Sequence, residues 1–231
     1  MNDDIYLDWK DWDETTFANY SKLEKVYFDN ITKLVSLSNG ASILEIGFGN
    51  GSFLGYAHIE GYSCDGIESN NKLIDNAKKN NFSAYNTIDQ IDNQKKYDLI
   101  VLFDVIEHIE ADKVEIFINK LKDKLAIDGS IFLRFPNGSS PLGLGNQHGD
   151  PTHCNIVTLS KLNYWCNNLG LEMIKYRGDI RPFIFRHKIN KAPSRIIKFI
   201  LFNLTEKFIR LISNQSKGIL ASNLEVVIKI K

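Results

Sequence analysis

Hydrophobic residues along the chain follow two patterns that take turns. Short, continuous apolar runs such as residues 97–103 (YDLIVLF) are typical of parallel strands that are covered on both faces. Between these runs, apolar residues recur every three or four positions, which predicts helices. The runs predict strands at 42–47, 63–68, 83–86, 97–103, 130–135, 171–176 and 223–231. The helical spacing predicts helices at 51–58, 71–80, 113–125 and 159–169.

Strands and helices that alternate in this way predict an α/β fold with an open, mainly parallel sheet and right-handed crossovers. We expect a single domain of 231 residues. Its parts are a helical cap with aromatic anchors (1–40), a central core (41–178), a helical insertion or lid (179–218) and a final strand (219–231).

Two segments do not follow the alternation. Residues 136–152 are rich in Gly, Pro, Asn and Ser and predict a long loop, which in a compact domain is often functional. Residues 192–213 predict a helix with a wide apolar face and a positive excess on the opposite face. This helix either packs as a lid or homodimer face, or docks on an anionic membrane or holds a lipid tail.

Composition narrows the class of protein. Lys plus Arg and Asp plus Glu both count 28, so the formal net charge is zero and nucleic acid is not expected as a partner. Three cysteines without a CxxC pair argue for a reducing compartment. The polar N-terminus is unlike a signal peptide, and no apolar run is long enough to span a membrane. We expect a cytoplasmic protein, with any membrane contact peripheral and at the inner face.

A glycine-rich turn follows the first predicted strand, in ILEIGFGNGSFL. Gly47, Gly49 and Gly51 alternate there, which lets the backbone approach a ligand closely. Dinucleotide-binding turns carry a small Gly or Ala where this chain has Ser52, and Glu45 would repel a pyrophosphate. The turn therefore disfavours an NAD(P) enzyme and suits a cationic or amine-bearing ligand.

Acidic residues end the next predicted strands. Glu68, in DGIESN, is placed to accept hydrogen bonds from a ribose diol. Asp104, Glu107 and His108, in FDVIEHI, gather at the same carboxyl edge of the sheet, where open α/β sheets bind ligands.

Taken in order, ILEIGFGNGSFL, DGIESN, YDLIVLFDVIEHI and DGSIFLRFPN resemble the successive motifs of class I S-adenosylmethionine-dependent methyltransferases. The resemblance covers roughly residues 40–178. It implies a Rossmann-like, doubly wound sheet of seven strands in the order 3-2-1-4-5-7-6, with the last strand antiparallel. It also implies S-adenosylmethionine as cofactor and S-adenosylhomocysteine as product.

The resemblance assigns site residues. Phe48 stands where the family often has a small residue or cysteine, which leaves the turn intact. Implied for the cofactor are Glu45, Gly47, Phe48, Gly49 and Gly51 (methionine part), Glu68 (ribose), Ser69 and Asn70 (adenosine), Ile88 and Asp89 (adenine), and Phe103, Asp104, Val105 and His108 (the other side). Implied for the acceptor are Tyr20, Arg134 and Asn137.

The loop GNQHGDPTHC resembles a subgroup whose loop reads D-x-T-H and which is frequent in surface-polysaccharide and small-metabolite pathways. A sugar hydroxyl needs a base or a metal to lose its proton near neutral pH. His153 and His148 are the candidate bases, and Asp150 the candidate orienting partner. Alternatively, the Asp150-Pro151 turn and these side chains only tie the loop down.

A metal is not expected. Asp104, Glu107 and His108 could ligate a divalent ion, since some quinone O-methyltransferases carry a similar arrangement, but we do not predict one. Two histidines and Asp150 in the loop lack a fourth zinc ligand.

The sequence thus favours O-methylation of a hydroxyl on a sugar or glycan intermediate, with a small-molecule or glycan acceptor. A quinone or lipid-phenol O-methyltransferase, an N-methyltransferase of a small metabolite, and a non-catalytic cofactor-binding scaffold remain alternatives.

Overall fold

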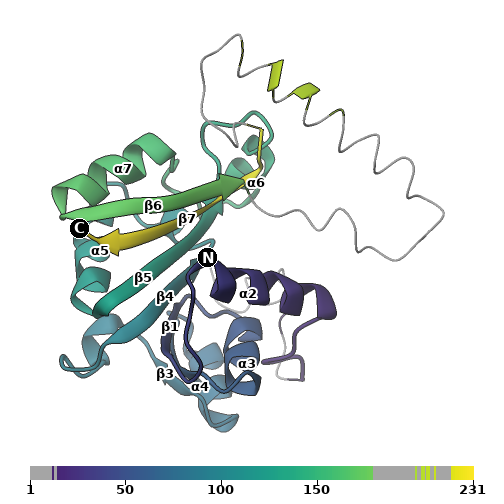
Figure 1. Cartoon of the computed structure of the whole chain (residues 1–231). Coiled ribbons are helices and arrows are strands. Elements are labelled where there is room, and N and C mark those ends of the chain that lie inside the picture. The colour runs from purple at the N-terminus through teal and green to yellow at the C-terminus, as the bar shows by residue number, and fades with distance from the viewer. Residues whose placement is uncertain are drawn as a thin grey trace.

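The computed structural model describes residue 12, residues 15–178, residues 201, 204, 205, 207, 208 and 211, and residues 220–231. Seven strands form one sheet in the order β3-β2-β1-β4-β5-β7-β6 (Figure 1). The pairs among β1 to β5 are parallel, and β7 runs antiparallel to both β5 and β6. The predicted order and the antiparallel last strand are confirmed. The strands are β1 (Ser42–Ile46), β2 (Ser63–Ile67), β3 (Ser83–Tyr85), β4 (Tyr97–Phe103), β5 (Leu125–Pro136), β6 (Leu171–Gly178) and β7 (Asn223–Ile230).

Helices cover both faces of this sheet (Figure 1). The α-helices are α2 (Lys22–Leu34), α3 (Ser52–Ile59), α4 (Asn71–Lys79), α5 (Val114–Asp123), α6 (Leu144–Gly149) and α7 (Leu159–Asn168). Two short 3-10 helices are η1 (Ile88–Gln90) and η2 (Ile106–His108).

Side-chain alternation along the strands divides the core between the two faces. In β4, Ile100 and Leu102 pack toward α5 and α7, in a cluster that includes Ile118 and Trp165. Their neighbour Val101 packs in the opposite cluster, which α2 and α3 close with aromatic side chains. Because β4 is covered on both faces, its sequence is a nearly continuous apolar run, which is why this strand could be predicted. The strand β6 is more exposed and mixes polar with apolar residues.

The predicted loop at 136–152 contains a helix that the composition did not indicate. The helix α6 is short and has no side-chain cap. Its residue Gln147 is buried and donates a hydrogen bond from its side chain to the carbonyl of Asn155, which anchors the helix. The prediction of an unbroken loop was wrong because this tertiary contact, rather than helix propensity, stabilises the turn.

The predicted helix at 192–213 lies largely outside the described residues. The described positions within it are helical, and the side chains of Leu201, Leu204, Phe208 and Leu211 are exposed. Among the residues that were placed, no helix is long and apolar enough to cross a membrane.

The N-terminus of α2 offers a direct test of local stability. The Ser21 side chain accepts a hydrogen bond from the Glu24 N–H, and the Glu24 carboxylate accepts one from the Ser21 N–H, which is a complete capping box. We expect Ser21→Ala to lower the free energy of unfolding by about 1 kcal/mol and Tm by about 2–4 °C. Thermal unfolding checks this, with the exposed Ser38→Ala as control. Equal Tm values in the two variants would argue against the cap.

Candidate active site

The carboxyl edge of the sheet opens into a cavity of about 940 Å³. Parallel strands bring the segments after β1, β2, β4 and β5 together at this edge, and α2 and the segment around α6 close its sides. Lining residues from the sequence prediction are Glu45, Gly47, Phe48, Gly49, Glu68, Ser69, Asn70, Phe103, Asp104, Val105, His108, Arg134, Asp150 and His153.

The glycine turn after β1 leaves no room for side chains. Gly47 and Gly49 have φ angles of 69° and 53°. A Cβ on Gly47 would lie 2.7 Å from the Val105 side chain, and one on Gly49 would lie 2.6 Å from the Trp12 ring. At Gly47 and Gly49 the turn therefore offers backbone rather than side chains at the cavity wall, with the Trp12 ring next to Gly49.

Glu68 joins this turn to the end of β2. Its carboxylate accepts hydrogen bonds from the N–H groups of Gly49 (3.1 Å), Ser69 (2.7 Å) and Asn70 (3.1 Å). Asn70 in turn caps α4 by accepting hydrogen bonds from the N–H groups of its first turn. The carboxylate is thus fixed at the cavity wall.

Glu45 is a buried carboxyl beneath the same turn. Only 3% of its surface is exposed, and its Oε2 has no hydrogen-bond partner among the described residues. Burial, and then the nearby charge of Glu68, raise the pKa of Glu45 well above its ordinary value. A cationic group placed at this wall would satisfy the orphaned oxygen. The bare glycine turn and these two carboxyls therefore fit S-adenosylmethionine, which carries an ammonium, a sulfonium and a ribose diol.

Asp104 and Arg134 form a charged pair at the wall of the cavity. Asp104 has a left-handed backbone conformation, with φ 55°. Its carboxylate accepts hydrogen bonds from Nε of Arg134, at 3.1 Å, and from Nη2 of the same guanidinium. The guanidinium also lies 5.7 Å from the ring centroid of Tyr27 and 5.3 Å from that of Phe103. We call the part of the cavity that is lined by η2 and by the segment around α6 its far end.

His153 occupies that far end with a defined orientation. Its Nδ1 lies 2.9 Å from the carbonyl oxygen of Gln147, which can only accept, so Nδ1 carries the proton. The lone pair is therefore on Nε2, which lies 3.9 Å from the Glu107 carboxyl and 3.9 Å from the Asp150 carboxyl. This nitrogen is placed to take a proton next to two carboxyl groups.

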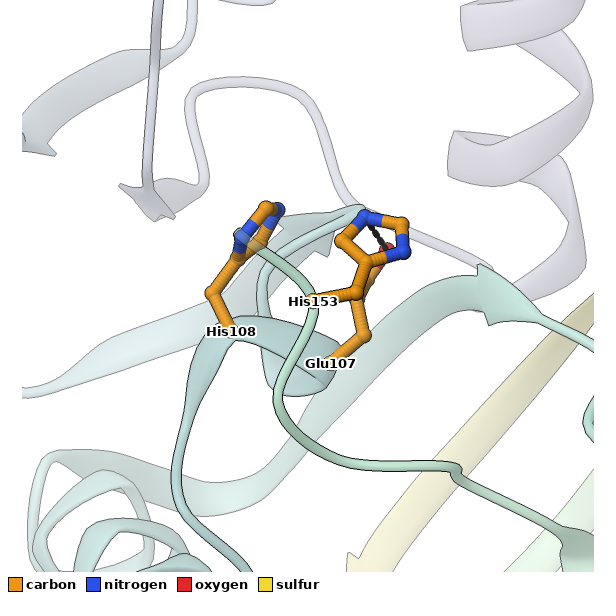
Figure 2. Close-up of side chains that lie close together, drawn as sticks. All are labelled: Glu107, His108 and His153. Atoms are coloured by element: carbon orange, nitrogen blue, oxygen red, sulfur yellow. Dashed lines mark ion pairs between the residues drawn. The ribbon is translucent and has the colours of Figure 1, made fainter. Parts of the chain in front are cut away.

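Glu107 and His108 lie beside His153, as Figure 2 shows. The rings of His108 and His153 meet edge to face, with centroids 4.6 Å apart. Glu107 is fully buried, and burial, then the charge of Asp104, raise its pKa to about 8.

The raised pKa makes stability depend on pH. Since the folded protein holds the proton on Glu107 more tightly than the unfolded chain, stability is greatest below about pH 4.5 for this group. It falls as the pH rises toward about 8. We expect Glu107→Gln to remove this fall, so that the Tm advantage of the variant grows with pH across that range. Thermal unfolding of both proteins at several pH values checks this, and a constant Tm difference would contradict it.

Six predicted site residues do not line the cavity. His148 is exposed on α6. Asn137 is buried and donates its amide to the carbonyl of Ala221, so it anchors the loop. Asp89 pairs with Lys120 at the surface. The others are Tyr20, which packs on Phe28 and Tyr56, Ile88, which lies in the core, and Gly51, which precedes α3.

Several lining residues were not predicted as site residues. Trp12 covers the glycine turn, Tyr27 projects from α2, and Thr152 bridges His108 and Asp150. Asn146 and Asn223 close the far end and are hydrogen-bonded to each other at 2.8 Å. Aromatic residues and Asn at these positions have no local signal, because contacts between distant segments bring them to the cavity.

A family model described as a methyltransferase domain matches residues 20–176. The structure is similar to a SAM-dependent methyltransferase from Archaeoglobus fulgidus (TM-score 0.66, 22% identity, 94% of this chain and 97% of that one). It is also similar to coclaurine N-methyltransferase bound to N-methylheliamine and SAH, with a TM-score of 0.56 and 13% identity over 88% of this chain and 71% of that one. A third similar structure is the mitomycin 7-O-methyltransferase MmcR, with a TM-score of 0.57 and 11% identity over 89% of this chain and 54% of that one. No curated protein matches the sequence.

The chain therefore belongs to the methyltransferase domain family. It is a class I S-adenosylmethionine-dependent methyltransferase, with S-adenosylhomocysteine as product.

Proposed function

We propose that this methyltransferase acts on a hydroxyl of a sugar or glycan intermediate, with His153 as the general base. The observation that carries the proposal is the orientation of His153, whose Nε2 holds a lone pair beside two carboxyls of the cavity. An amine acceptor would gain little from such a base. A sugar hydroxyl is too weak an acid to lose its proton without one, so a buried base favours O-methylation.

The cofactor occupies the glycine-turn end of the cavity in this proposal. Gly47 and Gly49 hold the methionine part against Glu45, Glu68 accepts from the ribose, and Ser69 and Asn70 border the adenosine. The chemistry that S-adenosylmethionine supplies is a methyl group already activated on a sulfonium. The remaining task of the chain is to align the acceptor oxygen with that methyl group and to remove its proton.

The cavity also has surfaces that suit a sugar. The rings of Tyr27 and Phe103 offer flat apolar faces, and the Asp104–Arg134 pair offers charged hydrogen-bonding groups beside them. Asn146 and Asn223 add amide donors and acceptors. A sugar needs this mixture, because its ring presents apolar C–H faces and its hydroxyls both donate and accept.

A methyl-transfer assay with the full chain tests the proposal. S-adenosylmethionine with a labelled methyl group is offered with free sugars, nucleotide sugars, phenols and amines, and products are identified by mass spectrometry. We expect methyl ethers of the sugar compounds. Methylation of amines alone would contradict the hydroxyl acceptor, and methylation of phenols alone would replace the sugar with an aromatic acceptor.

A further inference from the structure

We infer that Glu107, His108 and His153 form a binding site for a divalent first-row transition-metal cation at the far end of the cavity. One ligand atom of each residue can be chosen so that all three lie within 4.8 Å of one another. Figure 2 shows the two histidines on either side of the site, with Glu107 behind His153. The three residues come from two segments, η2 and the loop after α6, so the site depends on the fold.

The Glu107 carboxyl is the strongest indication of a ligand. It is 0% exposed, and neither of its carboxylate oxygens has a hydrogen-bond partner among the described residues. A carboxyl without such partners in the protein interior is costly, and paired charges or metal coordination are the usual compensation. Nε2 of His153 lies 3.9 Å from Oε1 of Glu107, which leaves space between the two groups.

The loop that carries His153 is docked on the segment that carries Glu107. The backbone carbonyl of Glu107 accepts hydrogen bonds from the N–H groups of Cys154 and Asn155, both at 3.0 Å. Two consecutive bonds next to His153 hold its backbone in register with Glu107. The separation of the candidate ligands is therefore set before any ion arrives, which lowers the cost of assembling the site.

Both imidazoles are oriented as metal-ligating histidines usually are, through a hydrogen bond at the other ring nitrogen. Nδ1 of His153 donates to the carbonyl of Gln147. Nδ1 of His108 lies 3.0 Å from the Thr152 hydroxyl, which itself donates to Asp150 and so can accept from the ring. In His153, the bound Nδ1 leaves Nε2 as the ligand atom.

The donor set indicates the class of cation. Two imidazole nitrogens and one carboxylate suit zinc, manganese, iron, cobalt or nickel better than magnesium or calcium, which prefer oxygen ligands. Three protein ligands leave a coordination position open, as in catalytic rather than structural sites. All three residues line the cavity, so an oxygen of the acceptor would be the natural additional ligand.

This set differs from those that the sequence suggested. Asp104 is paired with Arg134 instead of joining Glu107, and His148 is exposed outside the cavity. The role of the ion next to the acceptor rests on the proposed function, but its binding does not. Since Nε2 of His153 cannot hold both a proton and a cation, His153 acts as base only in the cation-free enzyme.

Calorimetry on the untagged full chain, stripped with a chelator, tests the site. Zn²⁺ and Mn²⁺ are the titrants, and the absorption spectrum of added Co²⁺ reports its coordination number. We expect one ion per chain. Glu107→Gln and His153→Ala should lower the affinity at least about 100-fold, more than the loss of an outer-shell partner typically costs. His148→Ala is the matched control, because it removes a histidine of the same segment, and its affinity should be unchanged.

Absence of saturable binding in the wild-type chain would overturn the inference, as would equal affinity in Glu107→Gln. Thermal unfolding and S-adenosylhomocysteine binding show whether each variant is folded, and His108→Gln replaces any variant that is not. No acceptor is present in the experiment. A failed sugar-methylation assay therefore leaves the metal result intact, and a failed titration leaves His153 as the base.

Discussion

Replacing His153 with alanine is expected to lower turnover at least about 100-fold while the affinity for S-adenosylhomocysteine stays unchanged. The imidazole lies beside Glu107 and Asp150, and it does not belong to the glycine turn. Its loss removes the proton acceptor without touching the wall at Glu45 and Glu68. Initial rates with excess chelator isolate the base role, because no cation then competes for Nε2.

His148→Ala is the control for this prediction, since His148 is exposed and does not line the cavity. Its turnover should equal that of the wild type. Added imidazole should restore part of the activity of His153→Ala, because it can enter the space left by the side chain and accept the proton. A variant whose KM rises while kcat is unchanged would show that His153 only binds the acceptor. If kcat of both His148→Ala and His153→Ala equalled that of the wild type, neither histidine of the loop would take part in the chemistry.

The fold was largely predictable because its signals are local. A strand buried on both faces needs an apolar run, and residues 97–103 have one. The strand β5 shows the limit, since it begins at Leu125 rather than at residue 130. Its first part includes Asp128, with φ 65°, and Gly129, and it is a strand because Leu125 pairs with Tyr97. Tertiary pairing of this kind leaves no pattern in the sequence.

The part of the cavity around the glycine turn was predictable for the same reason. The glycine turn and Glu68 each follow directly from a strand, so sequence order places them at one edge. The segments with weaker signals were placed less well. Ile88 and Asp89 follow a three-residue strand, and neither lines the cavity. Trp12, which covers Gly49, comes from a region with no motif.

The part of the cavity around His153 could not be predicted, because it depends on how the loop after β5 folds. His148 and His153 are equivalent in the sequence, both beside turn-forming residues. The buried side chain of Gln147 fixes α6, and its backbone carbonyl orients His153. Only this arrangement directs His148 outward and places His153 beside Glu107. The burial of Glu107, within the motif FDVIEHI, likewise could be seen only in the structure.

The second large effect is expected at the glycine turn, where Gly47→Ala should weaken binding of S-adenosylhomocysteine at least about 10-fold. A methyl group there would lie 2.7 Å from Cγ2 of Val105, and the φ of 69° is strained for any residue with a Cβ. Either Val105 or the turn must move, and both line the cavity. Calorimetric titration of the variant with S-adenosylhomocysteine measures the loss directly.

Gly61→Ala separates the clash from the backbone strain. Gly61 has a φ of 80°, but nothing lies within 4 Å of the position that its Cβ would take, and it does not line the cavity. Both variants should lose about 1–2 kcal/mol of stability from the left-handed backbone. Only Gly47→Ala should lose affinity, because only there does the added methyl group displace the wall that faces the ligand. If the two variants bound S-adenosylhomocysteine equally well, the turn at Gly47 would not be part of the cofactor site.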